Sequence, residues 1–211
     1  MRFFKDRYMA GRLLAKRLSR YKTKKNAIVL AIPRGGVIVG FELAKELEIM
    51  LDIIVTKKIA YPGNPEYAIG AIASGNVVLL DESIISTHKI RKSYLNSEIK
   101  DIKLEIQRRY KEYGLKNPIA NLNNKSVIIV DDGIATGYTT KASIKYAREQ
   151  KVEKVILAIP VMPRDTYEEI RLLVDEIVCL NIVDNFFAIS QFYEKFPQVE
   201  DEEVKRCLLN R

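Results

Sequence analysis

The chain has 211 residues and a formal net charge of +8, from 35 Lys and Arg against 27 Asp and Glu. Hydrophobic residues make up 47% and charged residues 29%, as in soluble globular proteins. No apolar run reaches the roughly 18 residues that cross a bilayer, which excludes a membrane-embedded chain. The length suits one α/β domain with a small appendage, and the positive charge favours an anionic partner, either a nucleic acid or a small anion.

The Arg-rich start of the chain predicts a helix rather than a targeting peptide. Leu13, Leu14 and Leu18 form an apolar stripe that suits packing on a core. We therefore predict a helix over residues 4–20, followed after a solvated link by a short buried strand, Ala27–Ile32.

The turn Pro33-Arg34-Gly35-Gly36 follows this strand and leads into a predicted helix, Val37–Leu47. Paired glycines let the backbone approach a ligand closely, and an arginine suits an anion. A plain turn with a solvent-facing arginine is the alternative.

A second strand, Leu51–Thr56, ends in Lys57 and Lys58. The breaker-rich segment 59–67 predicts a loop, and two short apolar runs within residues 68–80 predict a hairpin. The lysine pair suits an anion at a strand end, although lysines in such places are often merely solvated.

Leu95, Ile99, Ile102 and Ile106 recur at helical spacing and predict an amphipathic helix from Ser93 to Tyr113. Its apolar face suits packing on the sheet, with a dimer contact as the alternative.

The cysteines and the histidine show no site of their own. Cys179 and Cys207 have neither zinc-binding spacing nor a disulfide pattern, and His88 stands beside no nucleophile of a triad. We expect a reduced, cytoplasmic protein without metal ligands of its own.

The segment 127–139 is the most informative of the chain. Four β-branched residues, Val127–Val130, predict a strand buried on both faces, and Asp131 and Asp132 follow at its end. Ligands of open α/β sheets bind at the carboxyl ends of strands. Two ionised carboxylates suit the vicinal hydroxyls of a sugar.

The small residues at 133–137 then lead into a helix that starts near Thr139 or Thr140. Such a helix start offers backbone N–H groups to a phosphate, so the whole segment predicts a sugar phosphate site. A tight turn with solvated acids is the alternative. A nucleoside triphosphatase loop is disfavoured further, because it needs Gly-Lys-Ser/Thr and Gly137 is followed by Tyr138.

Lys154–Ile159 predicts a further strand, 164–174 a helix and Glu176–Leu180 a last strand, before an aromatic tail. The alternation of strands and helices predicts a doubly wound parallel sheet of the α/β class in a single domain, 1–211. The glycines that open the first of these βα units have the wrong spacing for a Rossmann oxidoreductase.

The segment 127–139 closely resembles the phosphoribosyl pyrophosphate (PRPP) motif of the type I phosphoribosyltransferases: a hydrophobic run, two acids, two small or apolar residues, Ala-Thr-Gly and a closing Thr. The turn at 33–36 and the segment 62–66 support a resemblance to a prokaryotic group of uncharacterised acceptor specificity. The resemblance implies a small hood over the acceptor, built from parts of 1–25 and 181–211.

The resemblance also implies residue roles. Asp131 and Asp132 would hold the ribose hydroxyls and, with Lys58, form the catalytic set. The implied substrate-binding residues are Arg34, Gly35, Gly36 and Lys57 at the pyrophosphate, and Ala135, Thr136, Gly137, Tyr138 and Thr139 around the 5′-phosphate. The loop 59–67 would close over the substrate.

The implied activity is transfer of the 5-phosphoribosyl group of PRPP to a nitrogen acceptor, a nucleobase in the family, with Mg2+ bound mainly through PRPP. Ala135 stands where enzymes for 6-oxopurines usually have an acid, which disfavours hypoxanthine and guanine. A homodimer is compatible with the resemblance, whereas no nucleic-acid-binding motif or membrane segment is recognised. The alternative is a PRPP-sensing regulator or a nucleic-acid-binding protein on the same fold without turnover.

Overall fold

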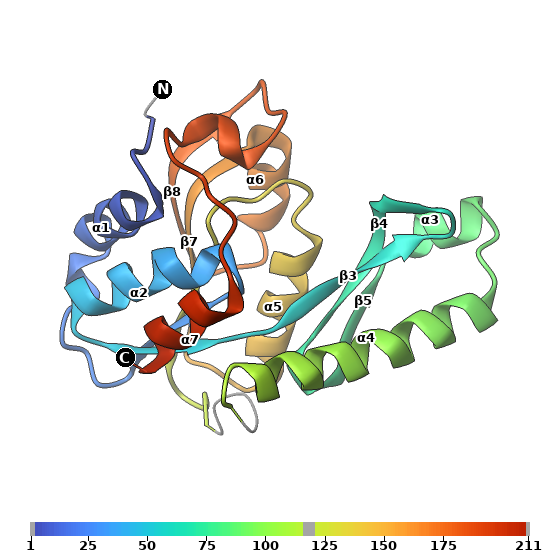
Figure 1. Cartoon of the computed structure of the whole chain (residues 1–211), viewed down its shortest axis with the longest axis horizontal. Helices are drawn as coiled ribbons and strands as arrows, with labels where there is room; N and C mark the ends of the chain where they lie inside the picture. The colour runs from blue at the N-terminus through green and yellow to red at the C-terminus, as the bar shows by residue number, and fades with distance from the viewer. Residues whose placement is uncertain (1–2, 116–120, 210–211) are drawn as a thin grey trace.

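The computed structural model describes residues 3–115 and 121–209. Its centre is a parallel sheet of five strands in the order β2-β1-β6-β7-β8 (Figure 1). The strands are β1 (Ala27–Ala31), β2 (Met50–Ile53), β6 (Ser126–Val130), β7 (Lys154–Pro163) and β8 (Glu176–Val183). The predicted doubly wound α/β fold is confirmed.

Helices cover both faces of this sheet. One face carries α1 (Arg7–Arg17), α2 (Gly35–Leu47) and α7 (Asp201–Leu209), and the other carries α5 (Tyr138–Glu149) and α6 (Arg164–Ile170). Successive strand residues point to opposite faces. Val29 and Ile128 therefore pack with the first group of helices, and Ile28 and Val127 with the second. This two-sided burial explains why the strands are continuous apolar runs.

The winding of the sheet reverses between β1 and β6. β1 pairs with β2 on one side and with β6 on the other, and Ala31 at its end is opposite Val130. The Ile32 N–H donates to the Val130 carbonyl at 2.9 Å, which keeps the two chains together beyond the strands. Ligands of open α/β sheets bind at such a reversal, so the turns after β1 and β6 are placed to form one site.

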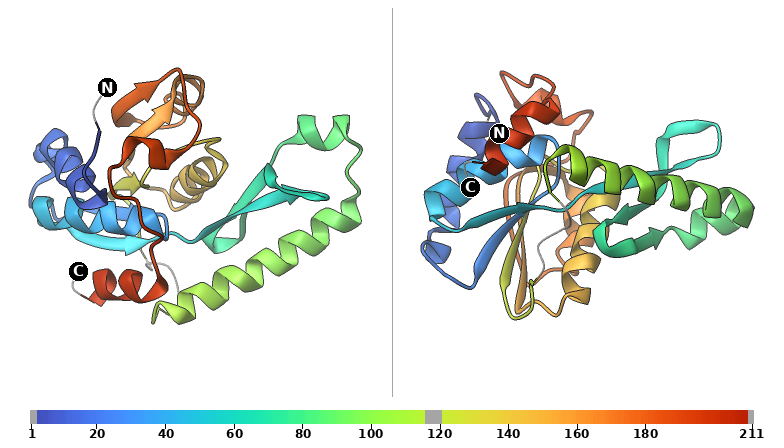
Figure 2. Two further views of the ribbon diagram at one scale, coloured as in Figure 1. Left: turned by 45° about the horizontal axis from the view of Figure 1, so that its top comes forward. Right: turned by 60° about the horizontal axis from the view of Figure 1, so that its bottom comes forward.

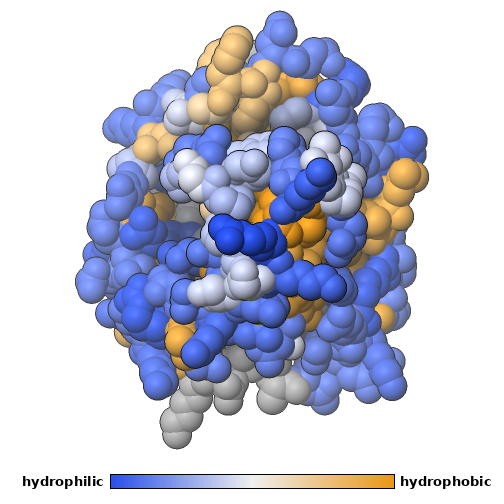
Figure 3. All heavy atoms as spheres, turned by 90° about the vertical axis from the view of Figure 1, so that its right-hand side faces the viewer, coloured by the Kyte–Doolittle hydropathy of each residue, from blue (hydrophilic) through white to orange (hydrophobic). Residues whose placement is uncertain are grey.

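A smaller sheet and two helices form an arm beside the main sheet (Figure 2). The sheet contains the antiparallel strands β3 (Thr56–Tyr61), β4 (Asn64–Ala73) and β5 (Val77–Leu80), and α3 (Glu82–Thr87) and α4 (Lys92–Glu112) follow. We call residues 56–112 the arm. Figure 3 shows the end of the molecule that carries it, where hydrophilic side chains surround smaller apolar areas.

The prediction of a loop over 59–67 is wrong, because both arm strands run through this segment. Only Pro62 and Gly63 separate the strands, and Gly63 has a φ of +80° that suits a tight turn. Across the hairpin the rings of Tyr61 and Tyr67 lie 5.7 Å apart, and such cross-strand aromatic contacts stabilise a sheet. Closure over a ligand stays a prediction.

The remaining elements largely follow the prediction. The hairpin within residues 68–80 is present around the short helix η2 (Ser74–Asn76), and α4 confirms the amphipathic helix. The first helix is shorter than predicted because the Asp6 carboxylate caps α1, and η1 (Ser19–Tyr21) follows it. α3 and α7 have no counterpart in the prediction, and α6 ends at Ile170. Among the described residues no helix is both long and apolar enough to cross a membrane.

The first and last parts of the chain lie side by side. Phe4 forms a parallel bridge with Tyr193, and its N–H donates to the Phe192 carbonyl at 2.9 Å. These three residues form an apolar cluster with the end of β7 and with the short helix η3 (Ile189–Phe192). The assignment of these segments to a hood stays a prediction.

Candidate active site

The acids at the end of β6 press against the glycine turn at the end of β1. A Cβ atom at Gly35 would lie 1.9 Å from Asp132 Oδ2, and one at Gly36 would lie 2.8 Å from the Cα of Asp131. Both distances are shorter than side chains tolerate, so any larger residue would displace an acid. The paired glycines therefore bring the predicted pyrophosphate turn into contact with the predicted ribose-binding acids.

The turn at 135–137 is fixed by a hydrogen bond from α6 and leads into the N-terminus of α5, which has no side-chain cap. Thr166 Oγ1 donates to the Ala135 carbonyl at 2.8 Å. Gly137 adopts a φ of +75° and supplies no side-chain cap to α5. The first turn of α5 therefore presents its backbone N–H groups and the positive end of the helix dipole in front of the turn. This arrangement suits a phosphate.

One cavity of about 190 Å³ brings many of the predicted residues together. Lys58 reaches it from the arm, the acid pair from the end of β6, and Ile189 from η3. Its lining comprises Lys58, Asp131, Asp132, Gly133, Ile134, Ala135, Thr136, Gly137, Thr139, Thr140 and Ile189. Carboxylates that can accept hydrogen bonds from hydroxyls, a helix N-terminus that suits a phosphate, and a lysine thus line one cavity. This combination suits a sugar phosphate.

The other predicted residues stand around this lining. Gly35 and Gly36 lie against the acids, and Lys57 points away from Lys58 because neighbouring strand residues face opposite sides. Arg34 follows a cis peptide bond, and its half-exposed guanidinium lies 3.8 Å from a carboxylate of the segment before α7. The structure therefore does not place the two lysines side by side.

Tyr138 points to the arm instead of the cavity. Its hydroxyl donates to Asp81 Oδ2 at 2.7 Å, and the other oxygen of Asp81 caps α3 through the Ile84 N–H. Hydrogen bonds from Ser83 and Tyr138 lower the pKa of Asp81. Burial, followed by the bond to Asp81, raises the pKa of Tyr138. The start of α5 is thereby tied to the arm.

Burial raises the pKa of both acids in the cavity. The pKa of Asp131 lies well above its usual range, first because of burial and second because of the neighbouring charge of Asp132. The pKa of Asp132 is also raised by burial, and Arg7 opposes that rise. Perturbed carboxyl groups in a cleft are typical of functional sites.

Sequence reasoning missed two residues that hold Asp132. Arg7 Nε donates to Asp132 Oδ2 at 2.7 Å, with both side chains largely buried, and the Tyr193 hydroxyl donates to the Asp132 carbonyl at 2.7 Å. A signal for Arg7 exists, because it shares the buried stripe of α1 with Ala10 and Leu14. An arginine on such a stripe is rarely buried without a partner. The aromatic tail alone does not single out Tyr193.

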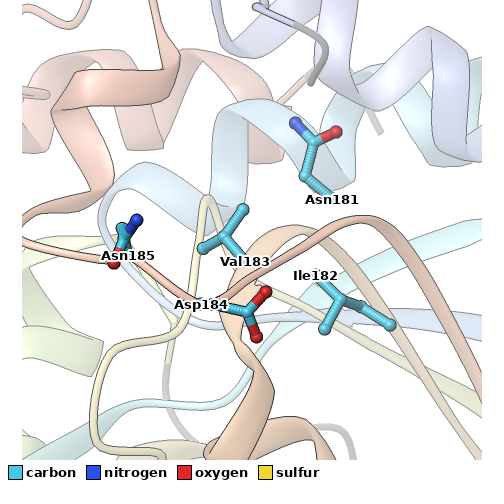
Figure 4. Close-up of a pocket in the computed structure, with 5 residues that line it drawn as sticks. All are labelled: Asn181, Ile182, Val183, Asp184 and Asn185. Atoms are coloured by element: carbon cyan, nitrogen blue, oxygen red, sulfur yellow. The ribbon is translucent and has the colours of Figure 1, made fainter.

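Most aromatic side chains of the tail belong to the core. The rings of Phe186 and Phe192 stack with centroids 5.8 Å apart, whereas Phe187 is 91% exposed. A second hollow of about 280 Å³ lies nearby, at the end of β8 (Figure 4). It is lined by Asn181, Ile182, Val183, Asp184 and Asn185.

A metal site built from side chains alone is absent over residues 3–115 and 121–209, where no group of three or more His, Cys, Asp and Glu could hold an ion. Mg2+ keeps several waters and takes substrate phosphate oxygens as ligands. Its binding here would therefore depend on oxygens that a phosphate-bearing ligand brings.

The family model for the phosphoribosyl transferase domain matches residues 4–197. The chain belongs to the phosphoribosyl transferase family. The resemblance found in the PRPP motif is thereby confirmed. Two Mycobacterium tuberculosis proteins, from strains CDC 1551 and H37Rv, carry phosphoribosyl transferase in their names and are each 39% identical over 204 residues. This family member matches them over 97% of its own length but spans 46% of theirs.

Two solved structures share the fold of this chain. The crystal structure of TT1426 from Thermus thermophilus is 33% identical and has a TM-score of 0.82, covering 100% of this chain and 99% of that chain. A hypothetical protein from Neisseria gonorrhoeae, crystallised with bound ppGpp, is 14% identical with a TM-score of 0.51 and covers 99% and 96% of the two chains. The second likeness concerns the fold alone.

Proposed function

We propose that this protein transfers the 5-phosphoribosyl group of PRPP to a nitrogen acceptor and releases pyrophosphate. The observation that carries the proposal is the single cavity shared by the acid pair, the turn before α5 and Lys58. In the proposed complex the 5′-phosphate lies at the start of α5 and the ribose hydroxyls donate to Asp131 and Asp132. The pyrophosphate then lies toward Lys58 and the glycine turn.

The proposed chemistry is a displacement at C1 of the ribose. The C1–oxygen bond to pyrophosphate breaks while a nitrogen of the acceptor forms its bond to C1, and positive charge develops on the ribose. Fixed charges are most useful where such charge develops. Asp131 and Asp132 face the ribose, and Lys58 faces the leaving group, with Arg34 and Lys57 farther out. Mg2+ would neutralise the pyrophosphate and arrive as its complex with PRPP.

For the acceptor we propose a nucleobase other than a 6-oxopurine. Ala135 lines the cavity where a proton-handling acid would stand in enzymes for hypoxanthine and guanine. Ile189 lines the side of the cavity that belongs to the tail, and the exposed Phe187 lies two residues before it. Apolar and aromatic side chains of this kind suit a planar base.

The test is PRPP-dependent release of pyrophosphate in the presence of Mg2+ and a panel of purines, pyrimidines and amines. We expect release with one acceptor class, and its loss in the variants Asp131→Asn and Asp132→Asn. Asp101→Asn, an exposed acid on α4, serves as the matched control and should retain the activity.

Two outcomes would favour the alternative on the same fold. PRPP binding without pyrophosphate release for any acceptor would indicate a PRPP-sensing regulator. Salt-dependent binding of RNA or DNA without PRPP binding would indicate a nucleic-acid-binding protein. Size-exclusion chromatography of the same preparation tests whether the protein forms the homodimer with which the resemblance is compatible.

A further inference from the structure

Arg7 reaches the acid pair from the first helix of the chain without lining the cavity. We propose that Arg7 is a positioning residue for PRPP, which fixes Asp132 in one orientation and supplies the positive charge that keeps the acid pair ready to accept the ribose hydroxyls. This inference rests on the proposed function. It adds a residue outside the PRPP motif to the ribose subsite.

The guanidinium of Arg7 is fixed by three different contacts. Its Nε donates to Asp132 Oδ2 at 2.7 Å, and its Nη1 donates to the Pro197 carbonyl at 2.8 Å. Its central carbon lies 3.7 Å from the centre of the Phe196 ring, a cation–π contact. The tail segment therefore prevents the guanidinium from turning. A lysine carries the same charge but cannot reproduce this fork.

The hydrogen bond from Arg7 occupies Asp132 Oδ2, which is closely packed against Gly35. A Cβ atom at Gly35 would lie 1.9 Å from Asp132 Oδ2 and 3.0 Å from Arg7 Nε, so turn, acid and arginine meet there. Oδ2 is thereby bound within the protein. Asp131 Oδ1 likewise accepts the Asp132 N–H, at 2.8 Å. Oδ1 of Asp132 and Oδ2 of Asp131 are therefore the acceptors for a diol, one for each of its two vicinal hydroxyls.

The charge of Arg7 addresses the main electrostatic problem of the subsite. Two adjacent buried carboxylates repel each other and favour protonation, and PRPP adds further negative charge. The charged or titratable groups around Asp132 are Arg7, Asp131, the Tyr193 hydroxyl on the Asp132 carbonyl, and Lys58 in the lining of the same cavity. Of the two cations, Arg7 is bonded directly to an acid. A protonated acid would lose acceptor capacity toward the ribose.

The experiment is calorimetric binding of PRPP with Mg2+ across pH 5.5 to 9, comparing the wild type with Arg7→Gln, Arg7→Lys and Arg17→Gln. We expect Arg7→Gln to weaken PRPP binding about tenfold at pH 7. The acidic limb of the binding profile, meaning the range in which PRPP affinity falls as the pH is lowered, should move up by about one pH unit, because loss of the cation raises the pKa of Asp132. Arg17→Gln removes the same charge from the exposed end of α1 and should leave both quantities unchanged.

Folding is checked by circular dichroism and thermal melting. If Arg7→Gln does not fold, Arg7→Lys decides: it should keep the acidic limb but weaken binding about threefold, as expected for one lost hydrogen bond. Unchanged affinity in Arg7→Lys, or an unchanged limb and affinity in folded Arg7→Gln, would overturn the inference alone. Absence of PRPP binding by the wild type at every pH would reject the proposed function and the inference together.

Discussion

At the scale of single residues, the burial of Asp131 and Asp132 disfavours their ionised form. Burial raises the pKa of Asp131 and of Asp132, so each ionised acid makes the folded state less stable than a neutral group would. A group with a raised folded pKa contributes its full stability below its unfolded pKa. That contribution is lost as the pH rises through the folded value. Under the proposed function, the site therefore holds two acids whose charge serves ribose binding at a cost to folding stability.

Asp131→Asn should separate these two effects. We expect the free energy of unfolding at pH 8 to increase by about 1–2 kcal/mol, and the gain to disappear toward pH 4, where the wild-type acid is protonated. The Asn side-chain oxygen can still accept the Asp132 N–H, which now bonds Asp131 Oδ1 at 2.8 Å. Urea denaturation at several pH values measures the effect.

The control for this prediction is Asp184→Asn. Asp184 is exposed, and its hydrogen bond with Arg164 lowers its pKa, so its replacement should not stabilise the protein at any pH. A loss of stability in Asp131→Asn at pH 8 would contradict the prediction.

Gly35→Ala tests the contact between the glycine turn and the acids. The added methyl group would overlap Asp132 Oδ2, so we expect a loss of about 1–3 kcal/mol of stability and weaker PRPP binding. Gly114→Ala is the control, since it meets no atom within 4 Å and suffers only from its φ of +74°. Denaturant unfolding and PRPP calorimetry measure both variants. Equal PRPP affinity in the two would show that the contact does not matter for binding.

At the scale of elements, the hydrogen bond from Tyr138 to Asp81 joins the start of α5 to the arm. Tyr138→Phe removes this hydrogen bond but leaves the cap of α3 in place. We expect a loss of about 1 kcal/mol and faster amide hydrogen exchange both in β5 and in the first turn of α5. Tyr94→Phe, which removes a bond to Ala60 inside the arm, should not accelerate exchange in α5. Exchange that is unchanged in both segments would refute the coupling.

The sequence predicts the elements whose fold depends on local pattern. The acids after β6 and the glycines after β1 are found at adjacent strand ends, because buried β-branched runs define parallel strands and the connections define their order. Local sequence rules do not predict the arm hairpin. Pro62 and Gly63 indicate a turn, but only the pairing of β3 with β4 shows that the strands continue up to it. Arg7 and Asp132 are 125 residues apart, and only the fold brings them together.

At the scale of the whole molecule, the net charge is strongly uneven. The first 25 residues contain ten of the 35 basic residues but only one of the 27 acids, so the rest of the chain is close to neutral. Four of these cations pair with acids elsewhere: Arg7, Arg12, Arg20 and Lys22. The side chains of Lys16, Arg17, Lys24 and Lys25 are exposed. The overall charge of +8 thus describes one region, and it need not describe the cavity.

Neutralising this region tests whether PRPP affinity depends on the net charge of the protein or on individual charges at the cavity. The variant Lys16→Gln, Arg17→Gln, Lys24→Gln, Lys25→Gln should bind PRPP within about twofold of the wild type at about 0.15 M salt. Arg17 lies about 15 Å along the helix from Arg7, and charges beyond about 8 Å are largely screened there.

The same variant should lose any retention on RNA, since such retention depends on accumulated surface cations. PRPP calorimetry at low and at physiological salt and an RNA filter-binding assay measure the two properties. A tenfold loss of PRPP affinity at physiological salt would mean that the basic start of the chain attracts the substrate from a distance. The expected contrast with Arg7→Gln, in which one buried cation matters more than four exposed ones, would instead place the recognition of the anion inside the cavity.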